Sequence, residues 1–299
     1  MLAPVFESIL DKQTEQDFDL FLRARNLWAR LEPRLGIQID RAGALAVGSA
    51  AYLAEVETKI RAMGLPAMRL PRSGLEVVAP GLGPNFTSAI LTREDWRIDP
   101  SRVMEALIEK ACAAGVTFVR QSIQGRDTAD YLVVATGASQ DFFSLAPELK
   151  VMSPIKGQIL NFPGLPGPDM VLRGEGAYGL KSAAGLIVGA TMEVGRGDFL
   201  VDETALTGLR QAAGLMFPDL RGVTSKVRVA VRGATPDGLP LVGPVGDGRV
   251  LLAVGARRNG WLLAPLLAET IRDYVMGREP GPLAARLHPA RFEANLERS

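Results

Sequence analysis

The stretch VLLAVGARRNGWLLAPLLAETIRDYVM, residues 250–276, decides the fold class. Its first five residues, Val250–Val254, are apolar and predict a strand buried inside a sheet. The loop Gly255–Gly260 carries two arginines and leads into Trp261–Met276, whose apolar periodicity predicts a helix. A strand that passes directly into a helix is typical of an α/β fold, and such folds place ligands where the strand ends.

The loop between this strand and this helix is the first candidate site. The N-terminus of the helix near Gly260 offers free amides and the positive end of the helix dipole to an anion. Arg257 and Arg258 favour recognition of a carboxylate or a phosphate, but solvated arginines on an exposed loop remain the alternative for this spacing. Arg232 lies in an apolar strand-like segment. We therefore expect it in a buried or cleft position, where it needs an anionic partner from the protein or from a ligand.

The rest of the chain alternates between helical and strand-like patterns. An α/β portion covers about 96–150 and 236–277, and an antiparallel portion covers about 37–95 and 151–235. The predicted helices are 5–35, 50–63, 99–114, 203–216 and 261–276. The predicted strands are a pair within 37–48, a short strand near 88–91, the segment GVTFVRQSI (115–123), a strand from Tyr131 that breaks at Gly137, several strands within 151–192, and the strands 226–231 and 250–254.

Composition excludes several classes of function. The chain has 299 residues, enough for two domains, and its 34 basic and 33 acidic residues leave a net charge of +1. Neither nucleic acid nor an anionic membrane is therefore an expected partner. One cysteine excludes an internal disulfide framework and a Cys-rich metal site, and one histidine excludes a His-cluster zinc site. No apolar run reaches the about 18 residues of a membrane span, and the N-terminus is too acidic for a signal peptide, so we expect a cytoplasmic protein without a metal site.

Three conspicuous features have structural explanations. Gly174-Glu-Gly-Ala-Tyr-Gly179 is a literal GxGxxG, a pattern that binds a dinucleotide when it links a strand to a helix. The residues that follow carry no helical periodicity, so a hairpin loop is the prediction. Cys112 falls on the apolar face of a predicted helix and is expected in the core rather than as a nucleophile. His288, beside Pro289, is expected to be structural or at the surface.

Two segments near the C-terminus resemble the motifs of one enzyme family. Arg232–Gly243 is similar to the pattern R-P-x-T-x-D-G-x-P-x-I-G, and Gly255–Pro265 is similar to G-H-x-R-N-G-x-x-L-A-P. Both patterns belong to the FAD-dependent amino-acid and amine oxidoreductases, the D-amino-acid oxidase superfamily. The resemblance is closest to the glycine oxidases associated with thiamine biosynthesis. Supporting matches follow in order along nearly the whole chain: Met1–Pro4, Ala129–Ala138, Pro154–Gln158 and Val188–Met192.

The sequence departs from the family pattern at several places. The strand, GxGxxG turn and helix that open the family's fold, with the acidic residue that binds ribose, have no counterpart here. Only Gln124–Thr128 separates Ile123 from Ala129, where the family has a longer hairpin. Gly233 takes the place of the usual proline, and Ala256 takes the place of the usual histidine. The resemblance therefore implies a mixed α/β fold with two interleaved domains. A discontinuous FAD-binding portion (1–36, 96–150 and 236–299) lacks its first strand, turn and helix, and an antiparallel-sheet substrate domain covers 37–95 and 151–235.

The resemblance also implies roles for individual residues. Arg232 would clamp the substrate carboxylate with Arg258 near the same group, Tyr178 would border the substrate, and Met192 would line its pocket. The loop Ala256–Leu262 would lie against the pyrimidine edge of the flavin. The residues implied to contact FAD are Met1, at the isoalloxazine, Ile123, at the adenine half, Gly137, Ala256, Arg257, Arg258, Asn259, Gly260, Trp261 and Leu262.

The implied activity is oxidative deamination of a small amino acid or amine, as in glycine and D-amino-acid oxidases, with FAD as the cofactor and oxygen as the electron acceptor. Two alternatives stay open. One is a D-amino-acid dehydrogenase that passes electrons to a quinone, and the other is a truncated, non-catalytic remnant or subunit of such an enzyme. The expected partner is a small-molecule amine or amino acid, and an open sheet edge would invite pairing into a homo-oligomer.

Overall fold

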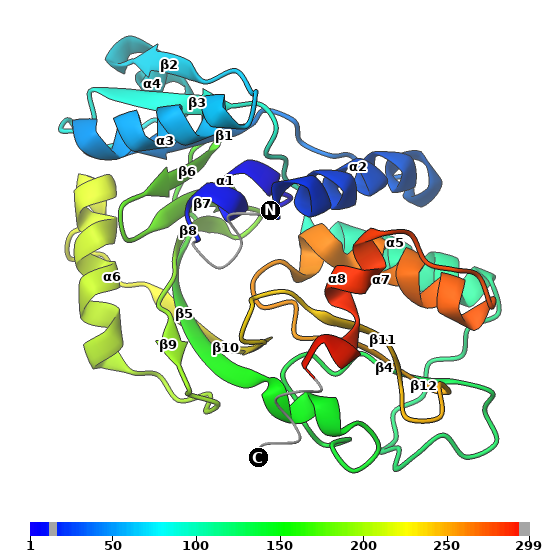
Figure 1. The fold of residues 1–299 in the computed structure, drawn as a ribbon. Helices are drawn as coiled ribbons and strands as arrows, with labels where there is room; N and C mark the ends of the chain where they lie inside the picture. The colour runs from blue at the N-terminus through cyan, green and yellow to red at the C-terminus, as the bar shows by residue number, and fades with distance from the viewer. Residues whose placement is uncertain (12–16, 293–299) are drawn as a thin grey trace. The chain divides into compact units, whose positions relative to one another are not determined.

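The structure, a computed structural model, describes residues 1–11 and 17–292 and has a mixed α/β fold (Figure 1). Its contacts divide the chain into two compact units. Unit 1 consists of Met1–Glu15, Ile39–Ile98 and Lys156–Val231, and unit 2 of Gln16–Gln38, Asp99–Ile155 and Arg232–Ser299. Which unit binds flavin and which binds substrate stays a prediction. Of the helices in the described residues, none combines the length and the apolar composition needed to cross a membrane.

Unit 1 contains most of a nine-stranded sheet of order β10-β5-β8-β7-β6-β1-β3-β2, with β9 paired to β5. Most neighbouring strands run antiparallel, as expected, whereas β1 and β6 run parallel. The strands are β1 (Ala44–Val47), β2 (Met68–Pro71), β3 (Ser88–Thr92), β5 (Ser153–Pro163), β6 (Val171–Gly174), β7 (Tyr178–Ser182), β8 (Gly185–Gly189), β9 (Glu193–Val194) and β10 (Lys226–Ala234).

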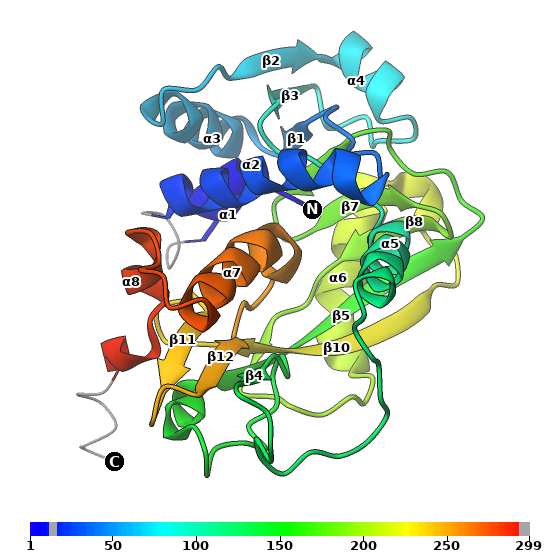
Figure 2. The ribbon, with the colours of Figure 1, turned by 90° about the vertical axis from the view of Figure 1, so that its right-hand side faces the viewer.

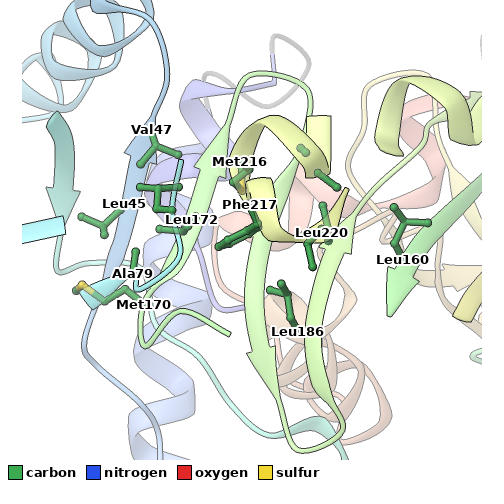
Figure 3. Close-up of a cluster of buried hydrophobic side chains, with 14 of the residues drawn as sticks. Leu45, Val47, Ala79, Leu160, Met170, Leu172, Leu186, Met216, Phe217 and Leu220 are labelled. Carbon is green, nitrogen blue, oxygen red and sulfur yellow. The ribbon is translucent and has the colours of Figure 1, made fainter. Parts of the chain in front are cut away.

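Helix α6 (Glu203–Met216) packs on this sheet. It begins after Asp202, whose carboxylate accepts a hydrogen bond from a first-turn amide at 3.0 Å. The C-terminal end of the helix places Met216 and the following Phe217 with Leu172 in the buried apolar cluster of unit 1 (Figure 3). The helix has the predicted bounds, because its cap and its apolar spacing are both local signals.

The same helix end explains the glycines of the literal GxGxxG. Gly174 and Gly179 flank the connection from β6 to β7, which run antiparallel, so the predicted hairpin is confirmed. A Cβ on Gly174 would lie 2.7 Å from Cε of Met216, and one on Gly179 would lie 2.9 Å from Cε2 of Phe217. The two glycines therefore let the end of α6 approach the sheet closely.

Helix α1 (Pro4–Ile9) begins on a buried carboxylate. The amides of Val5 and Phe6 donate hydrogen bonds to Oδ1 and Oδ2 of Asp95 at 2.8 and 3.1 Å. The next helix, α2 (Phe18–Leu35), is a separate element and ends at Gly36 in the left-handed conformation. The predicted single helix over 5–35 is therefore wrong, because the apolar spacing between residues 18 and 31 belongs to α2 alone. Residues 12–16 of that prediction lie outside the described residues.

The buried carboxyl of Asp95 should make the stability depend on pH. Burial raises the pKa of Asp95 to about 7, although the amide of Val5 and the charge of Arg173 act in the opposite direction. Because an unfolded aspartate titrates near pH 4, the folded state binds more protons between about pH 4 and pH 7, so stability from this group is lost as the pH rises through 7. At about 1.4 kcal/mol per pKa unit, we expect this group to lower the free energy of unfolding by about 2 kcal/mol between pH 5 and pH 7. Urea titrations at both pH values measure this fall. In Asp95→Asn the fall should be smaller by about 2 kcal/mol, and a fall of unchanged size would contradict its assignment to Asp95.

Unit 2 is built on a three-stranded sheet of order β11-β12-β4. The strands are β4 (Leu132–Val134), β11 (Leu241–Val245) and β12 (Val250–Val254), and β12 runs parallel to β4 and antiparallel to β11. Helix α7 (Gly260–Val275) packs on β11 and β12 and against α2 (Figure 2). The strand, loop and helix predicted over 250–276 are therefore present.

The remaining elements agree with the sequence in part. Helix α3 (Ala50–Ala62) and helix α5 (Pro100–Ala113), which Asp99 caps, have nearly the predicted bounds. The predicted strand pair within 37–48 is wrong, because Asp40 forms only an isolated bridge with Arg97 and β1 is the single strand there. The sequence pattern also misses β2, β9, β11 and five short helices. These helices are α4 (Arg72–Val78), α8 (Leu283–Leu287) and the 3-10 turns Pro147–Val151, Pro218–Leu220 and Pro289–Phe292.

The segment GVTFVRQSI, residues 115–123, forms no strand, which corrects that prediction. Among the described strands β4 pairs with β12 alone, and none of them offers this segment a partner for a hydrogen-bonded ladder. Its apolar side chains are exposed, with Phe118 at 60% and Val119 at 66%. Cys112 is exposed as well, because Val103 is the residue that α5 buries, so the prediction of a core cysteine is wrong.

Candidate functional site

Two loops of unit 2 that are separated in the sequence lie side by side. Strand β10 ends at Ala234, which forms an antiparallel bridge with Ala256, just after β12. The amide of Arg257 donates a hydrogen bond to the carbonyl of Gly233 at 3.0 Å. The two arginine-bearing loops therefore form one local structure.

A third segment meets them after strand β4. Gly137 follows this strand and has a φ of +69°. A Cβ on Gly233 would lie 2.9 Å from the carbonyl oxygen of Gly137 and 3.0 Å from Cα of Ala138. Both are backbone atoms, which do not give way as the end of a flexible side chain would. Gly233, which stands for the proline of the family pattern, therefore permits a close approach of two loops. Unit 2 thus brings together two segments predicted to contact a flavin, at Gly137 and 256–262, and the segment of Arg232, which is predicted to contact the substrate.

The close approach at Gly233 predicts a loss of stability on adding a single methyl group. We expect Gly233→Ala to lower the free energy of unfolding by about 1–3 kcal/mol, the usual effect of overpacking, since the new Cβ must displace the backbone at Gly137. The midpoint of urea unfolding measures the change. Gly281→Ala is a matched control in the same unit, because a Cβ there meets nothing within 4 Å. Equal midpoints for the two variants would contradict the close approach.

Helix α7 presents its N-terminus to the loop after β12. Asn259 is 5% exposed and stands at the N-cap, but its side chain makes no cap hydrogen bond. Its amide donates to the carbonyl of Ala256 at 2.8 Å, which closes the loop onto the helix. The indole of Trp28 in α2 donates to the carbonyl of Trp261 at 2.7 Å and holds the first turn. The first-turn amides and the positive end of the helix dipole therefore face this loop without a side-chain cap, an arrangement that suits an anionic or electron-rich ligand.

An ion pair fixes the turn that follows Arg232. Nε of Arg291 donates to Oδ2 of Asp237 at 2.8 Å, and Nη2 of Arg291 donates to the carbonyl of Leu239 at 2.8 Å. Burial acts to raise the pKa of Asp237, but the hydrogen bonds and charge of Arg291 outweigh it and hold this pKa below its usual value. The turn Pro236–Gly238 is thus tied to the C-terminal segment.

The described residues of unit 2 fit one edge of a flavin. The fit rests on the close backbone approach of Gly233 and Gly137 and on the N-terminus of α7, which suits an electron-rich ring edge. Arg232 and Arg258 are half-buried and add positive charge to this unit. The one literal GxGxxG of the chain is a hairpin rather than a nucleotide-binding turn. Within residues 1–11 and 17–292, no cluster of His, Cys, Asp or Glu could hold a metal ion.

Unit 1 contains the other residues predicted to contact substrate. Tyr178 begins β7 opposite Arg173 of β6 and Gly189 of β8. A Cβ on Gly189 would lie 2.6 Å from the hydroxyl oxygen of Tyr178, so the tyrosine ring lies across this glycine. The guanidinium of Arg173 lies 6.0 Å from the ring centroid and pairs with Glu7 at 2.8 Å. Met192 follows β8 with 47% of its surface exposed.

The predicted site residues thus fall into two groups, one in each unit. Unit 2 contains Gly137, Arg232 and the loop 256–262, which lie together, and also Ile123, which is 43% exposed on the segment without strand pairing. Unit 1 contains Met1, Tyr178 and Met192. The roles of all these residues stay predictions.

Sequence reasoning misses the charged side chains that hold the two groups in place. Arg291 and Asp237 fix the loop after Arg232, and Glu7 with Arg173 lies beside Tyr178. Lys156 is fully buried in β5. Only this last residue carries a signal in the sequence, because a lysine inside the strand-like run Pro154–Leu160 indicates a buried charge that needs a partner.

Comparisons with known proteins identify the family. The family model described as FAD dependent oxidoreductase matches residues 2–274. Glycine oxidase of Pseudomonas putida is 31% identical over 240 residues, which cover 70% of this chain and 65% of the relative. The bifunctional protein ThiO/ThiG of Trichormus variabilis is 29% identical over 331 aligned positions, which cover 98% of this chain and 49% of the relative. The chain thus spans about half to two thirds of the length of these curated relatives.

Solved structures share the fold. Glycine oxidase from Geobacillus kaustophilus has a TM-score of 0.77 at 22% identity, covering 92% of this chain and 83% of that one. Iminodiacetate oxidase from Chelativorans sp. BNC1 has a TM-score of 0.77 at 22% identity, covering 91% of this chain and 84% of that one. At 22% identity, the likeness to these two solved structures establishes the mixed α/β fold alone. The family is established by the family model, which covers most of the chain. The chain belongs to the family of FAD dependent oxidoreductases.

Proposed function

We propose that the protein is an FAD-dependent oxidoreductase that oxidatively deaminates a small amino acid or amine. The observation that carries the proposal is the assembly, in unit 2, of the loop after Arg232, the loop with Arg257 and Arg258, and the N-terminus of α7. The same loops carry the sequence motifs that resemble glycine and D-amino-acid oxidases. Relatives named glycine oxidase support this choice of substrate class.

Arg232 is proposed to hold the carboxylate of the substrate. A guanidinium can form two parallel hydrogen bonds with a carboxylate, which a lysine cannot. The backbone beside Arg232 is fixed by the bridge of Ala234 with Ala256, so the side chain starts from a rigid base. Fixing the carboxylate orients the Cα of the amine for reaction. Arg258 would add a second positive charge near the same group.

FAD, when bound, accepts a hydride from the Cα of an amine. The chain itself has to hold the substrate, exclude water and stabilise developing charge. The first-turn amides of α7, beginning at Gly260, would stabilise negative charge on the pyrimidine edge of the ring system. Tyr178 and Met192 would shape the substrate pocket, and the small, mostly apolar residues around them in the sequence favour a small amino acid.

A dehydrogenase that passes electrons to a quinone would use the same residues in the same roles. A solved structure of L-proline dehydrogenase from P. horikoshii shares the fold with a TM-score of 0.73. The electron acceptor, and not the amine site, separates this alternative from an oxidase, so peroxide release decides between them.

The test is an absorbance spectrum of the purified 299-residue chain with and without added FAD. We expect a bound-flavin spectrum that survives gel filtration and that bleaches on anaerobic addition of glycine or a D-amino acid. We also expect peroxide when the same mixture is exposed to air. Bleaching without peroxide would support the dehydrogenase. A chain that retains no flavin at saturating FAD overturns the proposal for this chain and supports a non-catalytic remnant.

A further inference from the structure

The segment that carries Met192 is held against β5 by a network of charged side chains around one buried lysine. Lys156 of β5 is 0% exposed. Its Nζ lies 2.7 Å from Oδ1 of Asp198 and 3.7 Å from Oε2 of Glu193. Both carboxylates belong to the segment 191–202 between β8 and α6. The hydrogen bond from Lys156 is the main reason that the pKa of Asp198 is lowered to about 2.

Arg196 completes the network from within the segment. Its guanidinium lies 2.9 Å from Oδ2 of Asp198 and 3.3 Å from Oε2 of Glu193, and it also pairs with Asp202. Two cations therefore face three carboxylates. Lys156 is the only one of these five side chains that comes from β5, the strand with which the short strand β9 of the segment pairs. Its side chain is fully buried, while that of Arg196 is 41% exposed. Lys156 is consequently the charged residue that ties the segment to β5.

Hydrogen bonds with Gln158 fix the chain on both sides of Met192. The amide of Gln158, also in β5, donates to Oγ1 of Thr191 at 2.9 Å, and the amide of Thr191 donates to the carbonyl of Gln158 at 3.1 Å. Nε2 of Gln158 donates to Oε1 of Glu193 at 2.9 Å. Met192 thus stands between two residues bound to the same glutamine, while 47% of its own surface stays exposed.

We propose that Lys156 is a positioning residue for the substrate site, where it sets the place of Met192 by anchoring the segment 191–202 to β5. This inference rests on the proposed function, in which Met192 lines the substrate pocket. Stability alone is a weak reason to retain a buried ion pair, because well-packed apolar residues of similar volume often serve as well or better. The charge of Lys156 favours the one arrangement of the segment 191–202 in which the carboxylates of Glu193 and Asp198 face it. A shift of about 1 Å in a pocket wall is enough to change binding or rate.

Lys156→Met tests the inference, because it keeps the length of the side chain and removes its charge. We expect hydrogen exchange of the backbone amides in 191–202 to become about tenfold faster, with the rest of unit 1 unchanged. In the flavin-loaded enzyme we expect KM for glycine to rise about tenfold while kcat stays within about twofold. Lys156→Arg should restore both values, since it returns a cation to the two carboxylates. Lys181→Met is the matched control, because Lys181 pairs with Asp169 at the surface and outside the segment.

Three outcomes would overturn the inference. Unchanged exchange in 191–202 means that Lys156 does not anchor the segment, and faster exchange spread over the whole of unit 1 means a general loss of stability. Faster exchange confined to the segment, with KM unchanged, removes the link to the substrate site. A wild-type chain that retains no flavin fails the test of the proposed function, and the substrate role of Lys156 fails with it. The exchange measurement still shows separately whether Lys156 anchors the segment.

Discussion

Arg232→Ala is expected to abolish most of the turnover while leaving the bound flavin unchanged. Truncating one partner of a buried, hydrogen-bonded charge pair costs about 2–5 kcal/mol. At about 1.4 kcal/mol for each tenfold change, kcat/KM for an amino acid should fall about 30- to 4,000-fold. The loop 256–262 should keep its conformation, because the contact between Gly233 and Arg257 and the bridge of Ala234 with Ala256 are made by backbone atoms. Steady-state oxidation of glycine, measured together with the absorbance spectrum, gives both quantities.

Three comparisons make the result specific to the carboxylate. Arg228→Ala is a matched control, because Arg228 lies on the same strand with its side chain in solvent. Arg232→Lys keeps the charge but loses the paired hydrogen bonds, so its activity should lie between the wild type and Arg232→Ala. A primary amine without a carboxylate should be oxidised equally by the wild type and by Arg232→Ala. Retained activity toward glycine would contradict the role of Arg232 in binding the carboxylate. Loss of bound flavin would instead mean that Arg232 supports the structure of the surrounding loops.

The elements that could be predicted from the sequence are those with complete local signals. Helix α6 has an aspartate cap and a regular apolar spacing, and it occupies 203–216 as predicted. Helix α5 has Asp99 before Pro100 and ends within two residues of Gly115. The strand, loop and helix over 250–276 are likewise set by neighbours in sequence. The juxtaposition of the loops after Arg232 and after β12 was accessible only through the motif resemblance, because nothing in their spacing implies that they meet.

The elements that could not be predicted depend on contacts distant in sequence. GVTFVRQSI has the composition of a strand, but a strand needs a hydrogen-bonding neighbour, and none of the described strands provides one. Cys112 lies on a helix with an apolar face, yet that face stays exposed, so periodicity alone gives the wrong burial. The partners of Lys156 and Arg173 lie 37 to 166 residues away in the chain, beyond the reach of any local pattern.

Glu7→Ala should cause a large loss of stability, about 3–5 kcal/mol, because it leaves a buried charge without its partner. Glu7 of α1 and Arg173 of β6 are 5% and 9% exposed, and their side chains pair at 2.8 Å. Within the residues that the structure describes, Nε of Arg173 makes no hydrogen bond, so this guanidinium depends strongly on Glu7. Urea unfolding at pH 7 measures the loss. A loss below about 1 kcal/mol, the range of a surface ion pair, would contradict the buried pairing.

The double variant Glu7→Ala with Arg173→Met separates the stranded charge from lost packing. If the charge dominates, adding Arg173→Met should recover much of the stability that Glu7→Ala removes, which is a non-additive result for residues in contact. The pH dependence gives an independent check through Asp95, whose pKa is raised by burial and would be higher still without the charge of Arg173. In Glu7→Ala, an ionised Asp95 is the carboxylate left to face this charge. The loss in Glu7→Ala relative to the wild type should therefore be smaller at pH 8, where Asp95 is ionised, than at pH 5, where it is protonated. An equal loss at both pH values would mean that Arg173 does not turn to Asp95 when Glu7 is removed.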